Sequence, residues 1–450
     1  MPALRSLSRG GLFLLTTAIA LIAACTADDE LDQDPTAADP SATVAPVTDI
    51  DFVSSDAPRR AASPAAAASV GAATNAFAAD LYALLAATNG DDNVVFSPYS
   101  AAVALAMTSE GARGQTASEI DAILHTDLAG GDLAAGFNGL DQALAAIPGE
   151  YPFGDVMVDL DLSTANQLFG QVGFGFEPEF LDTLAADYGA GMRLVDYLAA
   201  TEDARQQING WVGDQTRDRI PELIPKGVLN EDTRLVLTNA VYLNAPWQHR
   251  FAAAGTADAP FTRLDGTQVN VPLMHLNSPR GTYGDGPGYQ AVELPYVGGQ
   301  LSMLVVVPDA GEFESIEASL DANQIAGFRS SLRGVGLDLS FPKFEFRTQS
   351  PLKDALTQLG MPTAFTDAAD FSGITSDAPL AIAEVLHEAF IAVDEEGTEA
   401  AAATAVIAFA TSAPAEFVEL TVDRPFLFFI QERETGATLF MGRVTDPTAE

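Results

Sequence analysis

The sequence has very little of the two residue types that most often build reactive or metal-binding sites. Cysteine occurs once, at Cys25, and histidine occurs four times in 450 residues. A single cysteine excludes an intrachain disulfide and any site built from several thiolates. His387 and Glu388 begin a zinc-protease pattern, but Ile391 stands where the second histidine is required. Since a nucleophile elbow and a phosphate-binding glycine loop are also missing, we predict no catalytic residue, no metal and no cofactor.

Positive charge is equally scarce. The chain has 22 basic and 62 acidic residues, a formal net charge of −40, and only three lysines, Lys226, Lys343 and Lys353. Such a surface repels nucleic-acid phosphates and anionic lipid headgroups. We therefore expect no nucleic-acid partner, and contact with a membrane only through an attached lipid.

The N-terminal residues have the pattern of a secretory signal. Arg5 and Arg9 precede an apolar run over residues 12–24, which is too short for a transmembrane helix. The run ends directly before Cys25 and resembles a bacterial lipoprotein cleavage site, where the cysteine becomes the lipidated first residue. An ordinary signal cleaved nearby, with Cys25 present by chance, is the alternative. In the lipoprotein pattern, Thr26 in place of Asp permits passage to an outer membrane.

Composition then divides the chain into three parts. We predict a signal peptide over residues 1–24, a lipidated, acidic and disordered tether over 25–71, and a folded domain over 72–450. The tether is acidic and rich in proline and alanine, without sustained apolar periodicity. As a coil of about 45 residues it would reach roughly 35–40 Å, enough to hold a domain clear of a membrane. The expected location is an exported lipoprotein of the outer membrane or cell surface, on its extracellular or periplasmic face.

Within the folded part, helical spacing comes first and strand patterns follow. Ser97 and Pro98 form a helix start, because serine caps free amides and proline suits the first turn. Apolar spacing predicts helices from about residue 72 to Asn89, from Pro98 to Gly111, and over 201–219. Strands are expected over 301–307, 337–341, 344–346, 426–430 and 438–444, the last two as a hairpin. This order predicts an α+β domain.

The most unusual segment follows Asp394. Residues 400–413 are small or apolar, and they include neither a charge nor a glycine. A solvated loop is normally polar and rich in glycine, asparagine or proline, whereas a core strand has larger side chains. The composition therefore indicates a segment that is exposed at one stage and enters a sheet at another. A flexible, alanine-rich surface loop is the alternative.

The order Glu-Glu-Gly-Thr-Glu-Ala-Ala-Ala-Ala-Thr at residues 395–404 resembles the hinge of the reactive-centre loop of the serpins, the serine protease inhibitor family. Other stretches resemble family motifs in family order: 93–100, 111–116, 208–212, 238–243, 371–374, 387–389 and 439–444. The resemblance covers about residues 72–447. It implies the α+β serpin fold, with three β-sheets, about nine helices and an exposed reactive-centre loop.

The resemblance also implies a mechanical form of inhibition. A protease attacks the loop and forms an acyl-enzyme, and the freed hinge then inserts into the central sheet as a new strand. The hinge residues are Gly397, Thr398, Glu399, Ala400, Ala401, Ala402 and Ala403. We expect Gly397 to be the pivot, because glycine tolerates changes of dihedral angle, and Thr398 to enter first. From Gly397 to Thr411, a strand at ~3.3 Å per residue spans roughly 50 Å, enough to cross a large sheet.

Two groups of residues are expected around the opening of that sheet. By resemblance, the polar cluster beneath it is Ser97, Ser100, Asn239 and His387. Trp247, Lys343 and Glu395 map to the top of the sheet, where the loop first enters. We expect His387 to be structural, and a Lys343–Glu395 ion pair to have a positional role. Residues 244–246 depart from the family pattern, in which a lysine and a glycine are commoner.

The reactive bond is expected between Thr411 and Ser412, within about two residues, by family spacing from Gly397. Residues 408–413 include no charge, so a protease whose pocket requires arginine or lysine gains nothing there. The predicted target is an elastase-like or subtilisin-like serine protease, or a chymotrypsin-like one if the bond follows Phe409. A cysteine protease is a further candidate, and the inhibitor is expected to be a monomer. A non-inhibitory serpin-fold binding or storage protein is the main alternative, and a hydrolase without a recognisable motif is a weaker one.

Overall fold

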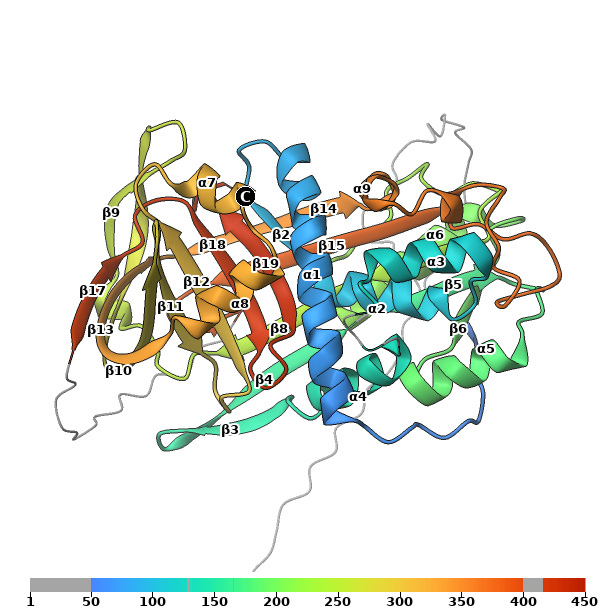
Figure 1. Cartoon of the computed structure of the whole chain (residues 1–450), viewed down its shortest axis with the longest axis horizontal. Helices are drawn as coiled ribbons and strands as arrows, with labels where there is room; N and C mark the ends of the chain where they lie inside the picture. Colours follow the sequence, from blue (N-terminus) through green and yellow to red (C-terminus); the bar gives the residue numbers. More distant parts are fainter. Residues whose placement is uncertain (1–49, 128–129, 131, 165, 400–415, 450) are drawn as a thin grey trace, which may run out of the picture. The chain divides into compact units, whose positions relative to one another are not determined.

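Nine α-helices are present in the described residues of the structure, a computed structural model (Figure 1). The structure describes residues 50–127, 130, 132–164, 166–399 and 416–449. The helices are α1 (Pro64–Thr88), α2 (Pro98–Ser109), α3 (Gly114–Ile123), α4 (Leu133–Ala145), α5 (Pro178–Thr183), α6 (Thr201–Gln215), α7 (Phe313–Ala318), α8 (Ala322–Ser330) and α9 (Lys353–Leu359). Short turns of other helix types occur at Leu184–Tyr188, Ala253–Gly255 and Thr363–Phe365. The predicted helices near 72–89, 98–111 and 201–219 are confirmed as α1, α2 and α6.

The first sheet contains β16, which is formed by two of the predicted hinge residues. Its order is β1-β6-β5-β7-β15-β16-β8-β4-β3, and β14 pairs with the other side of β15. The strands are β1 (Asp51–Val53), β3 (Gly149–Phe153), β4 (Val156–Thr164), β5 (Gln167–Gln171), β6 (Met192–Val195), β7 (Leu235–Asn239), β8 (Val241–Pro246), β14 (Phe344–Pro351), β15 (Glu384–Val393) and β16 (Gly397–Thr398). We call this the central sheet.

The remaining strands form a second hydrogen-bonded network, in the order β17-β13-β10-β11-β12-β18-β19-β2, with β9 also on β10. They are β2 (Val94–Phe96), β9 (Ala257–Thr262), β10 (Gln268–Gly286), β11 (Tyr289–Pro295), β12 (Leu301–Pro308), β13 (Arg333–Pro342), β17 (Phe417–Thr421), β18 (Phe426–Glu432) and β19 (Thr438–Val444). The three sheets expected from the family therefore form two networks here, because the long strand β10 pairs with β9, β13 and β11 in turn. The predicted terminal hairpin is confirmed as β18 and β19.

The core lies between these sheets and the helices that cover them. The strand β12 is buried along its whole length, as its continuous apolar run predicts. α1 packs on α4 and β19, while α2 contacts β7 and β19 and so lies against the central sheet. A second apolar cluster joins α6 to the central sheet through Ile208, Val212, Phe169 and Val236. α6 therefore covers strands close to the one that the loop is expected to join.

The folded part begins before the predicted boundary at residue 72. The prediction of a disordered tether is wrong for residues 50–71, because β1 pairs antiparallel with β6 and α1 begins at Pro64. Alanine is the best helix former, and its small side chain lets α1 approach α4 closely. A Cβ added to Gly136 of α4 would lie 2.7 Å from the Val70 side chain. An alanine-rich run that resembles low complexity is therefore the first part of a packed helix.

The same helix passes a composition test for a membrane span. α1 is long and apolar enough to cross a bilayer, but 67% of its most apolar 18-residue window is buried inside the protein. Ser63 caps its start by accepting a hydrogen bond from the Ala66 amide. The burial identifies α1 as a core helix.

Candidate functional site

In the middle of the central sheet, neighbouring strands are paired directly at one end and are separated at the other. β15 pairs in parallel with β7 from Glu384 opposite Val236 to His387 opposite Asn239. Beyond that pair, β8 and β15 share no backbone ladder with each other among the described residues. Instead, β16 lies between them, with Thr398 opposite both Ala245 and Val393. We call the facing edges of β8 and β15 the seam, and the first hinge residues occupy its open end.

A buried polar cluster holds the closed end of the seam. The His387 ring is fully buried, and its Nε2 atom accepts a hydrogen bond of 2.9 Å from the Ser97 amide. Its Nδ1 atom contacts the side-chain oxygen of Asn239 and therefore carries the ring proton. Burial lowers the pKa of His387 to about 4, so the ring is neutral at neutral pH. One imidazole thus ties β15 to β7 and to the start of α2.

Ser97 and Ser100 belong to the same cluster, at the start of α2. The Ser97 hydroxyl accepts a hydrogen bond of 3.2 Å from the Ser100 amide, which is the expected helix cap. The Ser100 hydroxyl donates to the side chain of Asn166, which lies between β4 and β5. Sequence reasoning missed Asn166, because it lies in a segment without a recognisable motif.

Trp247 supports the turn that leads into the hinge. Its ring stacks on Tyr296 with centroids 4.6 Å apart, and its indole nitrogen donates to the Asp394 carbonyl at 2.9 Å. The Trp247 amide also donates to the Glu396 carbonyl at 2.9 Å. The Asp394 side chain accepts from the Glu396 amide at 2.8 Å and closes the turn. The hinge therefore starts from a fixed position.

The Lys343–Glu395 ion pair is present beside this turn. The Lys343 ammonium lies 2.6 Å from one carboxylate oxygen of Glu395, and the Thr256 hydroxyl donates to the other at 2.7 Å. Burial alone would raise the pKa of Glu395, but the hydrogen bonds from Lys343 and Thr256 bring it below its usual value. Since the lysine is partly exposed, the pair contributes only ~0–1 kcal/mol, and its effect is to position the turn.

The space around Gly397 leaves no room for a side chain. It lies extended in β16, opposite Pro246, and a Cβ added to it would lie 2.3 Å from the Ala245 carbonyl oxygen. The positive φ in this turn, +54°, occurs at Glu399, and the role of Gly397 as the pivot of insertion stays a prediction. Ala245 and Pro246, where the sequence departs from the family pattern, are the residues that face the inserted hinge.

Thr398 is buried, with 4% of its surface exposed, and its hydroxyl lies 2.6 Å from that of Tyr296. Glu399 donates its amide to the Ala392 carbonyl at 2.9 Å and pairs with Arg219, which follows α6. Tyr296 and Arg219 were not predicted, since neither belongs to a motif.

The other predicted residues, Ala400, Ala401, Ala402, Ala403, Thr411, Ser412 and Cys25, lie outside the described residues.

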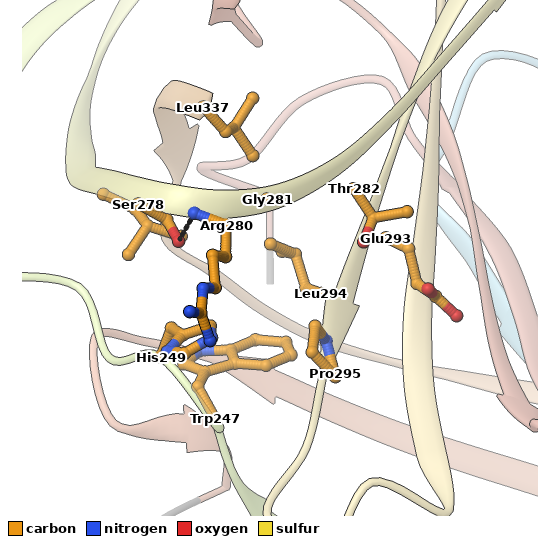
Figure 2. Close-up of a pocket in the computed structure, with 11 residues that line it drawn as sticks. Trp247, His249, Ser278, Arg280, Gly281, Thr282, Glu293, Leu294, Pro295 and Leu337 are labelled. Carbon is orange, nitrogen blue, oxygen red and sulfur yellow. Dashed lines mark hydrogen bonds between the residues drawn. The ribbon is translucent and has the colours of Figure 1, made fainter. Parts of the chain in front are cut away.

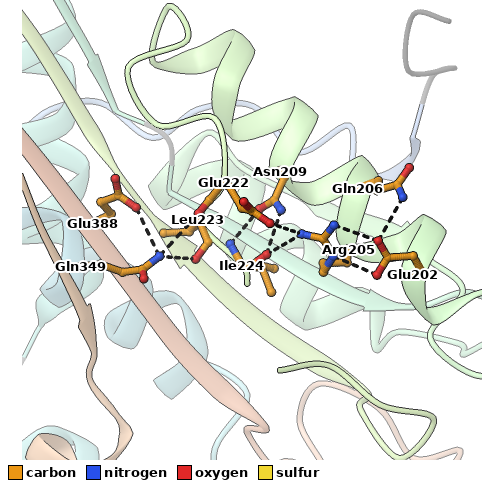
Figure 3. Close-up of polar contacts among 9 residues, drawn as sticks. All are labelled: Glu202, Arg205, Gln206, Asn209, Glu222, Leu223, Ile224, Gln349 and Glu388. Carbon is orange, nitrogen blue, oxygen red and sulfur yellow. Dashed lines mark hydrogen bonds and ion pairs between the residues drawn. The ribbon is translucent and has the colours of Figure 1, made fainter. Parts of the chain in front are cut away.

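A polar network anchors the segment that follows α6 (Figure 3). Arg205 of α6 donates to Glu222 at 2.9 Å, and Asn209 donates to the Ile224 carbonyl at 2.9 Å. From β14, Gln349 donates to the Leu223 carbonyl at 3.0 Å and to Glu388 of β15 at 3.3 Å. These contacts hold residues 222–224 against the strands on one side of the seam.

A small cavity lies beside Trp247, and Figure 2 shows residues that line it. Its volume is about 30 Å³, and its lining includes His249, Arg280, Glu293 and Pro295. This is room for one or two water molecules. Among the described residues, no group of three or more His, Cys, Asp or Glu side chains is arranged to hold a metal ion. This cavity therefore offers no substrate site, and the seam remains the candidate functional site.

The sequence and the fold were compared with those of known proteins. The family model described as Serpin (serine protease inhibitor) matches residues 72–447. An uncharacterized serpin-like protein of Thermococcus kodakarensis is 40% identical over 378 residues, which are 83% of this chain and 85% of the relative. The leukocyte elastase inhibitor of Bos taurus is 37% identical over 84% of this chain and 99% of its own length.

Solved structures that are at least 25% identical to this chain include the following two. The native state of tengpin, a thermophilic serpin, is 26% identical, with a TM-score of 0.72 over 83% of this chain and 94% of its own. Human thyroxine-binding globulin, in complex with its ligand, is 28% identical, with a TM-score of 0.74 over 85% of this chain and all of its own.

Proposed function

The chain belongs to the serpin family and has the serpin fold, and from this premise we propose that it is a suicide-substrate inhibitor of serine proteases. The observation that carries the proposal is β16: two hinge residues already lie as a strand between β8 and β15, where an inserting loop must enter. Relatives named as leukocyte elastase inhibitors, at 36–37% identity, support the inhibitory class.

The register of β16 sets how far the alanine run would reach. Thr398 pairs antiparallel with Val393 on one side and with Ala245 on the other. If an inserting strand kept this register, residue 404 would lie opposite His387 of β15 and opposite Asn239 of β7. Residues 399–403 would therefore fill the seam as far as its closed end. Four of these five residues are alanine, which enters a packed sheet without overfilling it. Any further insertion must separate His387 from Asn239.

This order of events gives the inhibitory mechanism. The protease attacks the loop as a substrate and forms an acyl-enzyme, which frees the hinge from the rest of the chain. The alanines of the hinge then pair one after another with β8 and β15 along the seam. The strand next breaks the His387–Asn239 contact and continues along the full length of the sheet. The attached enzyme is carried along before it can hydrolyse the acyl bond.

The uncharged loop directs the choice of target. We infer cleavage between Thr411 and Ser412 by an elastase-like or subtilisin-like serine protease, with a chymotrypsin-like enzyme as the target if the bond follows Phe409. Small side chains suit a shallow apolar pocket, whereas a pocket with a buried carboxylate requires a cation. A cysteine protease that accepts the same residues is the other candidate.

A panel of proteases tests the function and the bond together. The purified chain is incubated with elastase, subtilisin, chymotrypsin, trypsin and papain, and covalent complexes are sought by denaturing electrophoresis. Mass spectrometry of the released C-terminal fragment then gives the bond: a start at Ser412 supports the main assignment, and a start at Ala410 supports the chymotrypsin-like one. Cleavage without any covalent complex would instead indicate a non-inhibitory member of the family. Efficient complexes with trypsin would contradict both assignments.

We also propose that the protein is exported and anchored by a lipid on Cys25. With the folded part beginning near residue 50, the tether is about 25 residues and would reach roughly 25–30 Å as a coil. Cys25→Ala should abolish incorporation of labelled fatty acid and release the protein from the membrane fraction, while inhibition is unchanged. Retention of the variant in the membrane would contradict the lipid assignment.

A further inference from the structure

The chain that follows α6 places two arginines on opposite sides of the seam. Arg217 lies over the ring of Tyr242 in β8, 5.4 Å from its centroid, and pairs with Asp161 of β4 at 2.8 Å. Arg219 lies over the ring of Phe390 in β15, 5.3 Å from its centroid. Arg217 and Asp218 both have positive φ angles, +51° and +60°. The backbone between the two arginines is thus turned sharply where it passes the seam.

Among the described hinge residues, Gly397–Glu399, the contact is made by Arg219. The Nε atom of Arg219 donates to the carboxylate of Glu399, whose side chain is 10% exposed. Arg347 of β14 lies over the same Phe390 ring, at 5.6 Å, and donates to the Arg219 carbonyl at 3.4 Å. The arginine that contacts Glu399 is therefore itself held in place from β14 and β15.

Glu399 has a conformation that stops a strand. Its φ of +54° is uncommon for a residue with a side chain, whereas a strand residue needs φ near −120° to −140°. The preceding residue, Thr398, is still a strand residue, and the Glu399 amide still bonds to β15. The next step of insertion must rotate Glu399 out of this conformation. That rotation redirects its side chain away from its present contact with Arg219.

We propose that Arg219 is a positioning residue of the inhibitory reaction, which holds Glu399 in the turn that stops the hinge after two inserted residues. The contact slows insertion while the loop is intact, so the protein stays in its active state until a protease cuts the loop. The significance of this role rests on the proposed function, but the contact and its test do not require a protease.

The test compares Arg219→Gln with Arg217→Gln. Both substitutions remove a partly exposed arginine from the same turn, but among the described residues the first removes an ion pair with Glu399 of the hinge and the second an ion pair with Asp161 of β4. Intact protein is incubated below its unfolding midpoint, and the urea-resistant, loop-inserted monomer is followed on native gels. Arg219→Gln should convert roughly three- to ten-fold faster than the parent, the factor expected for one charge-assisted contact, and Arg217→Gln should convert at the parent rate.

Two further readouts separate this role from a general loosening of the turn. Added salt should speed conversion of the parent and leave Arg219→Gln nearly unchanged, because salt screens only the pair that is still present. Glu399→Gln should match Arg219→Gln, and combining the two should add nothing further. Arg219→Lys should restore most of the parent behaviour.

Equal rates for Arg219→Gln and the parent would overturn the proposal, as would equal acceleration by Arg217→Gln. Slower conversion of Arg219→Gln would also overturn it, because Arg219 would then draw the hinge inward rather than stop it. Failure of the proposed function looks different: the parent would form no covalent complex with any protease, whereas the order of the conversion rates would be unaffected.

Discussion

In the proposed mechanism, His387 holds together the two strands that the inserting loop must separate. Its two ring nitrogens are both used, one by α2 and one by β7, so the closed end of the seam depends on a single neutral imidazole. Separating β7 from β15 breaks the contact with Asn239 first. At neutral pH the ring has no charge to be solvated, so the strands can part without exposing a buried ion.

The burial of His387 makes stability depend on pH. Its folded pKa, about 4, lies below the ordinary 6.5, so between these values the unfolded chain holds a proton that the folded chain lacks. Stability from this group is fully present above pH 6.5 and falls as the pH drops toward 4, by up to about 3 kcal/mol. Urea unfolding from pH 7 to 4.5 should show a shallower pH dependence for His387→Gln than for the parent. Parallel profiles would contradict this role.

Thr398 lies where a charge cannot be accommodated. The residue is buried beside Tyr296, so an arginine there must enter the sheet unpaired. Thr398→Arg should therefore turn the inhibitor into a substrate, with most molecules cleaved and few trapped in a complex. Thr398→Ser, which keeps the hydroxyl, is the matched control and should retain inhibition. The ratio of cleaved to complexed protein measures both, and an unaltered ratio in the arginine variant would refute the argument.

Motif order predicts which residues surround the seam, but not how they act. Ser97, Asn239 and His387 could be grouped from the sequence because each lies in a family-like stretch. Arg219 and Tyr296 could not, because their partners are 180 and 102 residues away and follow only from the strand pairing. Gly397 was selected for its dihedral freedom during insertion, and the structure adds a second requirement, its close approach to Ala245.

At the scale of elements, the N-terminal strap, residues 51–60, is the part of the fold that composition misidentified. The Arg193 guanidinium of β6 lies over the ring of Phe52, 5.3 Å from its centroid, and over the ring of Trp211, 5.2 Å from its centroid. Arg60 pairs with the buried Asp187 at 2.9 Å. A strand of three residues is too short for an alternating pattern, and docking contacts of this kind leave no periodic signal in a sequence. The strap extends the central sheet at the edge formed by β6.

The strap should therefore contribute to stability. Arg60→Ala leaves the Asp187 carboxylate, 1% exposed, without its charged partner and should cost about 1–3 kcal/mol. Arg333→Ala removes an arginine whose pairs are exposed and is expected to change stability little. Urea unfolding of both variants provides the comparison. Equal and small effects would mean that the strap only rests on the surface.

At the scale of the whole molecule, the fold class followed from the sequence because its signals are distributed along the chain. Helix starts such as Ser97–Pro98 and buried strands such as β12 are local, so they can be recognised one at a time. The pairing of distant strands is not local, and the position of β16 between β8 and β15 required the structure. That position joins the fold to the proposed function, since it shows where a further strand would be accommodated.

The central claim is that cleavage of the loop lets it join the central sheet. The most direct measurement is thermal unfolding of the intact chain and of the same chain cut within residues 408–413 by a protease that does not become trapped. An inserted strand adds a ladder on both β8 and β15 and relieves a sheet that is divided in the intact state, so the midpoint should rise sharply after cleavage. Thr398→Arg, cut at the same bond, should rise much less. An unchanged midpoint for the parent would contradict the account.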